Sequence, residues 1–276
     1  MPELPEVEVI CRGIRPYLTN RTIIKIYHNG KELRQKVPIT AMNRELIDNR
    51  IVAVERRAKY LLIHFDTSAL LIIHFGMTGN LGIFAPGTPI AKHDHVRLLL
   101  DNETELRFND TRRFGSINII YPEEQITLEQ DFFKNTGPEP FADDFNGKYL
   151  RLLARGKSQP VKAFIMTNRT VAGIGNIYAN ESLFAAHIRP SRRIKSISLK
   201  SWDRLASEIR KVLKHAISCG GSTISDFVNA SQERGYFQMN FKVYGRAGED
   251  CLTCSATIKK QVIGGRASYY CPKCQK

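Results

Sequence analysis

The chain has 276 residues, of which 42% are hydrophobic and 25% are charged, and such values are ordinary for a folded protein. Its charge is unusual, because 41 Lys and Arg residues outnumber 27 Asp and Glu residues and leave a net charge of +14. This excess favours a polyanionic partner, and nucleic acid ahead of a membrane surface because no basic amphipathic helix or lipidation signal is present. No apolar run approaches the roughly 18 residues of a membrane span, and the N-terminal glutamates are unlike a signal peptide, so we expect a cytoplasmic protein.

The first predicted element is an amphipathic helix over residues 4–18. Its apolar face repeats at helical spacing and consists of Val7, Ile10, Ile14 and Leu18. The chain start "MPELPEVEVI" fits the beginning of a helix, because Pro5 suits a first turn and the glutamates suit the positive end of the helix dipole. That interpretation leaves Pro2 without a purpose.

Residues up to 121 then follow a strand pattern. Short runs rich in β-branched and aromatic residues alternate with Asn, Gly, Asp and Pro. The runs are "RTIIKIYH", "RIVAVERR", "KYLLIHF", "ALLIIHFG", "HVRLLL", "TELRFND" and "GSINIIY". Seven strands at such close spacing predict a β-sandwich or barrel with the N-terminal helix packed against it. We assign this domain to residues 1–121.

The second half of the chain is predicted to be helical. An acidic, proline-bearing stretch over residues 122–147 predicts a linker. Beyond it, "NIYANESLFAAHI" and "SLKSWDRLASEIRKVLKHAISCGG" have helical periods, and the final glycine pair of the second suits a helix end. We expect a helical domain over residues 148–242, followed by a Gly- and Cys-rich domain over residues 243–276.

Four of the six cysteines form the most specific motif in the sequence. Cys251 and Cys254 make one CxxC pair, and Cys271 and Cys274 make another after 16 intervening residues. This spacing predicts one four-cysteine zinc site. Four thiolates leave no position for water, so the zinc is expected to be structural. The stretch between the pairs predicts a hairpin with a glycine pair near its tip.

Basic residues decorate this predicted zinc hairpin, namely Lys259, Lys260, Arg266 and Lys273. Contact with phosphate groups is the functional interpretation, and a solvated surface is the alternative. A second anion site is possible at "GIGNIYANE", where Gly173 and Gly175 precede a helical pattern and Asn176 suits the N-cap. Such turns more often merely connect helices, but the zinc hairpin and the net charge favour phosphate binding here.

Two further patterns lie in the strand region. His93 and His95 in "KHDHV" could ligate a metal, but without a third local ligand a phosphate-binding or structural role is favoured. Met77 in "HFGMTG" and Phe114 in "NDTRRFG" could fill the core, or they could form a wedge that enters DNA where a base has left the stack. From the residues alone, the core interpretation is favoured.

Taken together, these segments resemble the bacterial formamidopyrimidine-DNA glycosylases. The resemblance rests on "PELPEVE", "RRAKYLL", "HFGMTGNL", "KHDHV", "DTRRFG", "NTGPEPF", "VAGIGNIYANESLF" and the terminal CxxC pairs, in this order along almost the whole chain. It implies an α+β fold: an N-terminal β-sandwich with a flanking helix, then a helical domain with a helix-two-turn-helix, and a C-terminal zinc-finger hairpin. One departure is Ser255, where the family usually has glycine after the second cysteine.

The resemblance also implies an activity, that of a bifunctional DNA glycosylase and AP lyase of base excision repair. Its substrates would be 8-oxoguanine, formamidopyrimidines and abasic sites in double-stranded DNA. Removal of Met1 would expose the secondary amine of Pro2, which attacks C1′ and forms a Schiff-base intermediate before β,δ-elimination. An α-amino pKa near 8 leaves part of this amine neutral at physiological pH.

Family positions assign the other site residues in the same way. Glu3 matches the acid/base residue, Lys59 the proton donor in base loss or β-elimination, and Arg266 the residue for δ-elimination. The matching DNA-contact positions are His93, Arg112, Lys157 and Asn176. The residues that fill the space left by the everted nucleotide are Met77, Arg112 and Phe114, and residues 219–238 form the expected lid. The protein is expected to act as a monomer on nucleoid DNA, with one zinc ion and no membrane partner.

Two alternatives stay open. Endonuclease VIII is the sister family that acts on oxidised pyrimidines, and it typically has glycine where this chain has Leu4. A non-catalytic zinc-finger protein that senses damage or bends DNA would share the charge, the finger and the glycine turn. Such a protein would not require Pro2 and Glu3 at the start of the chain.

Overall fold

The computed structural model describes residues 1–121, 130–222 and 241–276. Backbone contacts divide the chain into two compact units, as far as its residues are described. Among the described residues, the sandwich unit comprises residues 1–121, 130–134 and 219–222, and the helical unit comprises residues 135–218 and 241–276. The three domain boundaries expected from the sequence, at residues 121, 147 and 242, stay a prediction.

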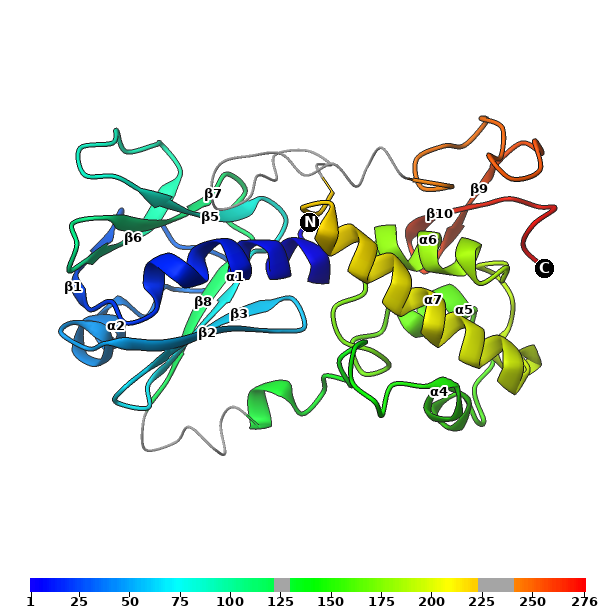
Figure 1. The fold of residues 1–276 in the computed structure, drawn as a ribbon, viewed down its shortest axis with the longest axis horizontal. Helices are drawn as coiled ribbons and strands as arrows, with labels where there is room; N and C mark the ends of the chain where they lie inside the picture. Colours follow the sequence, from blue (N-terminus) through cyan, green and yellow to red (C-terminus); the bar gives the residue numbers. More distant parts are fainter. Residues whose placement is uncertain (122–129, 223–240) are drawn as a thin grey trace. The chain divides into compact units, whose positions relative to one another are not determined.

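The predicted N-terminal helix is confirmed as α1 (Leu4–Leu18). Its apolar face is fully buried, and the helix packs against strands of both sheets of the sandwich (Figure 1). The carboxylate of Glu6 accepts a hydrogen bond from the backbone N–H of Glu3 at 2.8 Å. This bond satisfies a backbone donor at the helix start that has no partner within the helix.

The sandwich consists of two antiparallel four-stranded sheets. One sheet has the order β1-β6-β7-β5 and the other β2-β3-β4-β8. Their bounds are β1 (Ile23–His28), β2 (Ile51–Arg57), β3 (Tyr60–Phe65), β4 (Leu70–His74), β5 (Gly79–Phe84), β6 (Asp94–Leu100), β7 (Glu105–Asp110) and β8 (Ser116–Ile120). One hydrophobic core joins α1 to inward-facing residues of both sheets. The predicted β-sandwich is therefore confirmed.

Two elements of this unit were absent from the sequence prediction. β5 contains Gly79 and Gly82, which weaken the alternation of large side chains that marks a strand. Its hydrogen-bonded pairing with β7 stabilises the strand although the local strand propensity is low. The helix α2 (Ile39–Leu46) begins directly after Pro38 and buries only Met42 and Leu46. Two buried positions in eight residues give a weak periodic signal.

Helices dominate the second unit, as predicted. They are α4 (Gly147–Leu153), α5 (Val161–Ile165), α6 (Asn176–Ala185) and α7 (Leu199–Ser218), with a short 3-10 turn, η2 (Ile194–Ser196). α7 packs against α4 and α6 and buries Trp202 against Phe164 of α5. One detail was wrong: Gly175 occupies the N-cap of α6, and Asn176 is the first helical residue.

The predicted zinc hairpin is confirmed as β9 (Lys259–Ile263) and β10 (Arg266–Tyr270). Ile263 pairs with Arg266 across the Gly264–Gly265 turn. Both glycines have positive φ, as a two-residue turn that matches the strand twist requires. Within the described residues, no helix is both long and apolar enough to cross a membrane.

Candidate active site and metal centre

The start of the chain forms a buried polar cluster in the sandwich unit. Pro2 is buried, and the side chain of Glu3 is only 2% exposed. Burial lowers the pKa of the α-amino group of Met1 below its ordinary value of 8.0. The charges of Lys59 and Arg112 lower that pKa as well, whereas Glu3 and Glu6 oppose the shift. An amine at this place is therefore more often neutral than an exposed one.

Glu6 is a member of this cluster that sequence reasoning treated only as a favourable charge for the helix dipole. Besides the Glu3 N–H, its carboxylate accepts hydrogen bonds from the backbone N–H and the hydroxyl of Ser222, both at 2.9 Å. It thus ties the described part of the expected lid, residues 219–222, to the first turn of α1. The rest of that lid, residues 223–238, lies outside the described residues.

Three candidate wedge residues lie on two turns of the same unit. Met77 precedes β5 and is 40% exposed, and Phe114 precedes β8 and is 44% exposed. The guanidinium group of Arg112 lies 4.7 Å from the centre of the Phe114 ring. The sequence favoured a core position for Met77 and Phe114, but this exposure places them outside the core. We call Met77, Arg112 and Phe114 the wedge residues.

The two histidines of "KHDHV" differ in their surroundings. His95 is 1% exposed, and its Nε2 lies 2.9 Å from the carbonyl oxygen of Asp110 while its Nδ1 contacts the side chain of Asn29. Burial lowers its pKa, so it is a structural histidine that stays neutral. His93 is half-buried, with its ring centroid 6.2 Å from that of His95.

In the helical unit, a lysine that sequence reasoning missed joins the glycine turn to the zinc hairpin. Lys162 of α5 is fully buried, and its Nζ donates hydrogen bonds to Oδ1 of Asn176 at 2.6 Å, and to the Ala267 carbonyl and Ser268 Oγ at 2.7 Å. A charged residue inside the short apolar run "VKAFI" was the only available signal. These bonds fix the side chain of Asn176 at the N-terminus of α6.

The predicted site residues are thus divided between the units. The sandwich unit holds Pro2, Glu3, Lys59, Met77, His93, Arg112 and Phe114, and the helical unit holds Lys157, Asn176, Arg266 and the four cysteines. Within the helical unit, Lys157 is exposed between α4 and α5, and Arg266 is exposed at the first position of β10.

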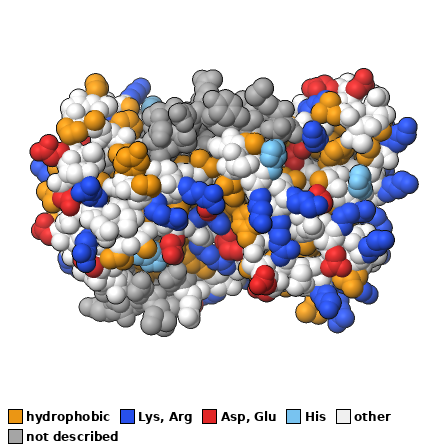
Figure 2. Space-filling model, in the orientation of Figure 1, with side chains coloured by type: hydrophobic (Ala, Val, Ile, Leu, Met, Phe, Trp, Pro, Cys, Tyr) orange, Lys and Arg blue, Asp and Glu red, His pale blue; other side chains and the backbone are white. Residues whose placement is uncertain are grey.

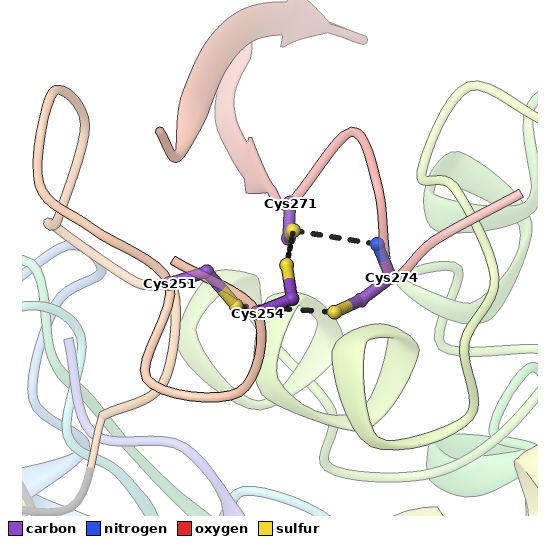
Figure 3. A group of neighbouring side chains, drawn as sticks. All are labelled: Cys251, Cys254, Cys271 and Cys274. Atoms are coloured by element: carbon purple, nitrogen blue, oxygen red, sulfur yellow. Dashed lines mark hydrogen bonds between the residues drawn. The ribbon is translucent and has the colours of Figure 1, made fainter. Parts of the chain in front are cut away.

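Four cysteine sulfur atoms gather beside the hairpin (Figure 3). All four lie within 4.8 Å of one another, and the Sγ atoms of Cys254 and Cys271 are 3.4 Å apart. They come from two separate turns, one before β9 and one after β10, as the spacing predicted. Among the described residues, this is the one group of three or more potential ligands that could hold a metal.

The protonation of these thiols also fits a metal site. Burial raises the pKa of Cys274, and the neighbouring sulfur atoms raise it further. Burial acts the same way on Cys251, but hydrogen bonds from the backbone N–H groups of Thr253 and Cys254, together with those from the thiols of Cys271 and Cys254, outweigh it and lower its pKa to about 7. Four thiolates this close repel one another unless a cation lies between them. The donor set fits one structural zinc ion.

Lys and Arg side chains gather over the face of the helical unit that α7 crosses (Figure 2). Those of α7 itself include the exposed Lys200, Arg204, Lys211 and Lys214. The basic residues of the hairpin, Lys259, Lys260, Arg266 and Lys273, are exposed as well. A surface of this kind attracts a polyanion.

Comparison with known families matches three consecutive parts of the chain. Residues 1–117 match the formamidopyrimidine-DNA glycosylase N-terminal domain, and residues 136–228 match the H2TH domain of the same glycosylases. Residues 248–276 match the zinc finger found in FPG and IleRS. The last match and the four sulfur atoms agree on one structural zinc.

Similar proteins cover the whole chain. The formamidopyrimidine-DNA glycosylases of Hahella chejuensis and Alcanivorax borkumensis are 45% and 47% identical to it over the full length of both chains. A crystal structure of a Lactococcus lactis FPG mutant with Fapy-dG containing DNA has a TM-score of 0.91 and 32% identity, with full coverage of both chains. A complex of Lactococcus lactis Fpg with abasic-site DNA has a TM-score of 0.90 and covers 99% of each chain.

Proposed function

The chain belongs to the formamidopyrimidine-DNA glycosylase family of repair enzymes, and we propose that it removes oxidised purines from double-stranded DNA and then cuts the strand as an AP lyase. Its substrates in this proposal are 8-oxoguanine, formamidopyrimidines and abasic sites. It acts as a monomer on the bacterial nucleoid. The observation that carries the proposal is the chain start, where Pro2 and Glu3 are buried and the charges of Glu3, Glu6 and Lys59 act on an α-amino group whose pKa is lowered by burial.

Pro2 is the proposed nucleophile once Met1 has been removed. Its neutral nitrogen attacks C1′ of the everted nucleotide, the bond from C1′ to the damaged base breaks, and the base leaves with a proton. Because a secondary amine has one proton to lose, the adduct becomes a cationic iminium. The lowered pKa of an α-amino group in this place supports the role, because only the neutral form can attack.

Glu3 and Lys59 are the proposed proton carriers. Glu3 adjoins the nucleophile, and its buried carboxyl group can protonate the sugar ring oxygen as the ring opens. Lys59 is close enough to the chain start for its charge to lower the pKa of the terminal amine. We assign Lys59 to proton donation during base loss or β-elimination. The iminium cation acidifies the C2′ proton, whose removal expels the 3′ phosphate.

Arg266 is proposed to assist the second elimination, in which the 5′ phosphate leaves. It extends from the exposed end of β10 beside the glycine turn, where a guanidinium can contact a phosphate. His93, Arg112, Lys157 and Asn176 are the proposed DNA contacts. For Asn176, the bond from Lys162 supports the role, because an amide fixed in one orientation contacts a phosphate at a lower entropic cost.

The structural zinc holds the hairpin that carries Arg266. When bound, it neutralises the thiolates of the four cysteines and ties the two CxxC turns together. Two further interactions hold the hairpin in place: β9 pairs with β10, and Lys162 donates a hydrogen bond to the backbone carbonyl of Ala267. The domain boundaries at residues 121, 147 and 242 belong to the same proposal.

Oxidised pyrimidines are the competing substrate class. One observation supports testing them: Lactococcus lactis FPG has been solved in complex with DNA that contains an oxidised pyrimidine. That protein is 32% identical to this chain, and its structure has a TM-score of 0.90. Against it stand Leu4 and the "DTRRFG" segment, which favour the purine enzyme.

Intact mass spectrometry combined with borohydride trapping tests the proposal. Duplexes containing 8-oxoguanine opposite cytosine, or thymine glycol, are incubated with the enzyme and reduced. We expect a protein without Met1 and a covalent adduct that forms faster with 8-oxoguanine. Preference for thymine glycol would support the sister activity. An absence of any adduct would leave only a DNA-binding protein.

A further inference from the structure

The wedge residues lie on two turns that are far apart in the sequence. The first turn connects β4 to β5 and carries Met77, and the second connects β7 to β8 and carries Arg112 and Phe114. Exposed side chains on turns ordinarily lose considerable conformational entropy when they insert into a ligand. A wedge that acts on stacked bases needs both turns held in one arrangement beforehand.

One buried carboxylate contacts both turns. Asp110, the last residue of β7, is 0% exposed. Its Oδ1 accepts a hydrogen bond from the hydroxyl of Thr78 at 2.5 Å and from the N–H of Arg112 at 3.3 Å. Its Oδ2 accepts one from the N–H of Gly115 at 2.7 Å. Thr78 follows Met77 and Gly115 follows Phe114, so each bond adjoins or includes a wedge residue.

Two further contacts join the two turns to each other. The hydroxyl oxygen of Thr78 accepts a hydrogen bond from the N–H of Arg112 at 3.0 Å, which joins the turns directly. A Cβ at Gly76 would lie 2.3 Å from the Phe114 backbone, so the two turns also touch through their main chains. The backbone N–H of Asp110 also donates to the carbonyl of His93, another proposed DNA contact, at 3.1 Å.

We propose that Asp110 is a positioning residue, whose carboxylate locks the two turns together and holds Met77, Arg112 and Phe114 as one pre-formed wedge. This inference rests on the proposed function and deepens it. A carboxylate suits the task because it offers acceptors in several directions and has no hydrogen to place against a donor. Asparagine has the same shape but only one acceptor oxygen, so it must turn an NH₂ group toward one of the three donors.

Asp110→Asn is the first test variant. We expect at least a tenfold slower excision of 8-oxoguanine from duplex DNA, because the wedge residues must be ordered during eversion. Borohydride trapping at a pre-formed abasic site has no base to evert, so its rate should change less than threefold. Asp101→Asn, an exposed aspartate at the far end of the same sheet, is the matched control and should match the wild-type protein.

Thr78 supplies a second pair of variants. Thr78→Val removes the hydroxyl between the turns and should show the same split between excision and trapping. Thr78→Ser keeps the hydroxyl and should restore both rates. Combining Asp110→Asn with Phe114→Ala should slow excision no more than Phe114→Ala alone, since both changes disable one wedge.

Amide hydrogen exchange provides a readout that does not depend on activity. Asp110→Asn should lose protection at Arg112 and Gly115 while protection in β3 and β4 stays unchanged. Normal excision by the folded variant, or an equal loss of excision and trapping, would overturn the positioning role. If the wild-type protein itself forms no adduct, the proposed function fails. Amide hydrogen exchange then tests by itself whether Asp110 holds the two turns together. Unchanged protection at the amides of Arg112 and Gly115 would overturn that role.

Discussion

The ammonium group of Lys162 donates a hydrogen bond to Oδ1 of Asn176, and the two atoms are 2.6 Å apart. The same ammonium group bonds two residues of β10, so one buried charge connects α5, α6 and the zinc hairpin. This charge is solvated by three protein oxygens in place of water. Its removal leaves the buried hydroxyl of Ser268 and the partly buried oxygens of Asn176 and Ala267 without this donor.

Lys162→Met should therefore destabilise the helical unit. Methionine fills a similar volume, but the oxygens of Asn176, Ala267 and Ser268 lose their donor, at a cost of about 2–4 kcal/mol in the free energy of unfolding. Urea unfolding followed by circular dichroism measures the change. Lys200→Met, on the exposed face of α7, is the control and should shift the midpoint little. Equal midpoints for the two variants would contradict this view of Lys162.

Pro2→Gly should slow base release strongly while duplex affinity survives. Glycine still allows removal of Met1, but it replaces the secondary amine by a primary one and loosens the buried chain start. We expect a loss of at least about a hundredfold in excision, typical of an impaired nucleophile or general acid/base. Single-turnover excision and equilibrium binding should be measured side by side. Full activity in this variant would refute the nucleophile assignment.

His74 should make the sandwich unit sensitive to acid. Burial, with smaller contributions from the charges of Lys59 and Arg34, lowers its pKa to about 4 from the ordinary 6.5. Below pH 6.5 the unfolded chain binds a proton that the folded chain does not, so stability falls until about pH 4, by about 3 kcal/mol.

The variant His74→Asn checks this prediction. Asparagine does not titrate, and its side-chain oxygen can still accept from the N–H of Gly76, as Nδ1 of His74 does. The loss of unfolding free energy between pH 7 and pH 4 should be smaller in this variant than in the wild type. The exposed His215→Asn change should leave that difference as it is.

Zinc removal should abolish tight binding to duplex DNA. Without the metal, nothing bridges the sulfur atoms of Cys251, Cys254, Cys271 and Cys274, and the hairpin that carries Arg266 loses its anchor. Binding can be titrated before and after chelation, and after zinc is returned. Cys11→Ala, which alters a cysteine of α1 outside the cluster, should bind normally. Undiminished affinity in the chelated protein would make the finger peripheral.

Ser255→Gly should stabilise the zinc finger. Ser255 has a φ of +58°, a left-handed conformation that costs a side-chain-bearing residue about 1 kcal/mol. Its N–H donates to the carbonyl of Cys251, so the turn cannot relax without losing a bond. We expect slower transfer of zinc to a competing chelator. Ser201→Gly, within helix α7, should instead lower thermal stability.

Local sequence signals sufficed wherever an element is defined by its own residues. The helix α1, the hairpin and the four-cysteine cluster each follow from spacing within a short segment, and each is present as predicted. The seven strand runs were also recognised, because β-branched and aromatic residues concentrate in them.

Other features depend on partners that are distant in the sequence. β5 becomes a strand through its pairing with β7, Glu6 meets Ser222, and Lys162 meets the hairpin about a hundred residues later. No periodic pattern reveals such pairs. The exposure of Met77 and Phe114 was likewise beyond a pattern that scores apolar side chains as buried.

The main-chain contact at Gly76 has a practical consequence for protein engineering. Because Gly76 touches the backbone of Phe114 and Gly115, the turns at residues 76–79 and 110–115, which connect the two sheets, cannot be exchanged independently. A chimera that takes one turn from a relative with a different backbone would place a foreign turn against an unadapted neighbour. Recombination libraries should transfer both turns together, as a single module of two separate stretches of the gene.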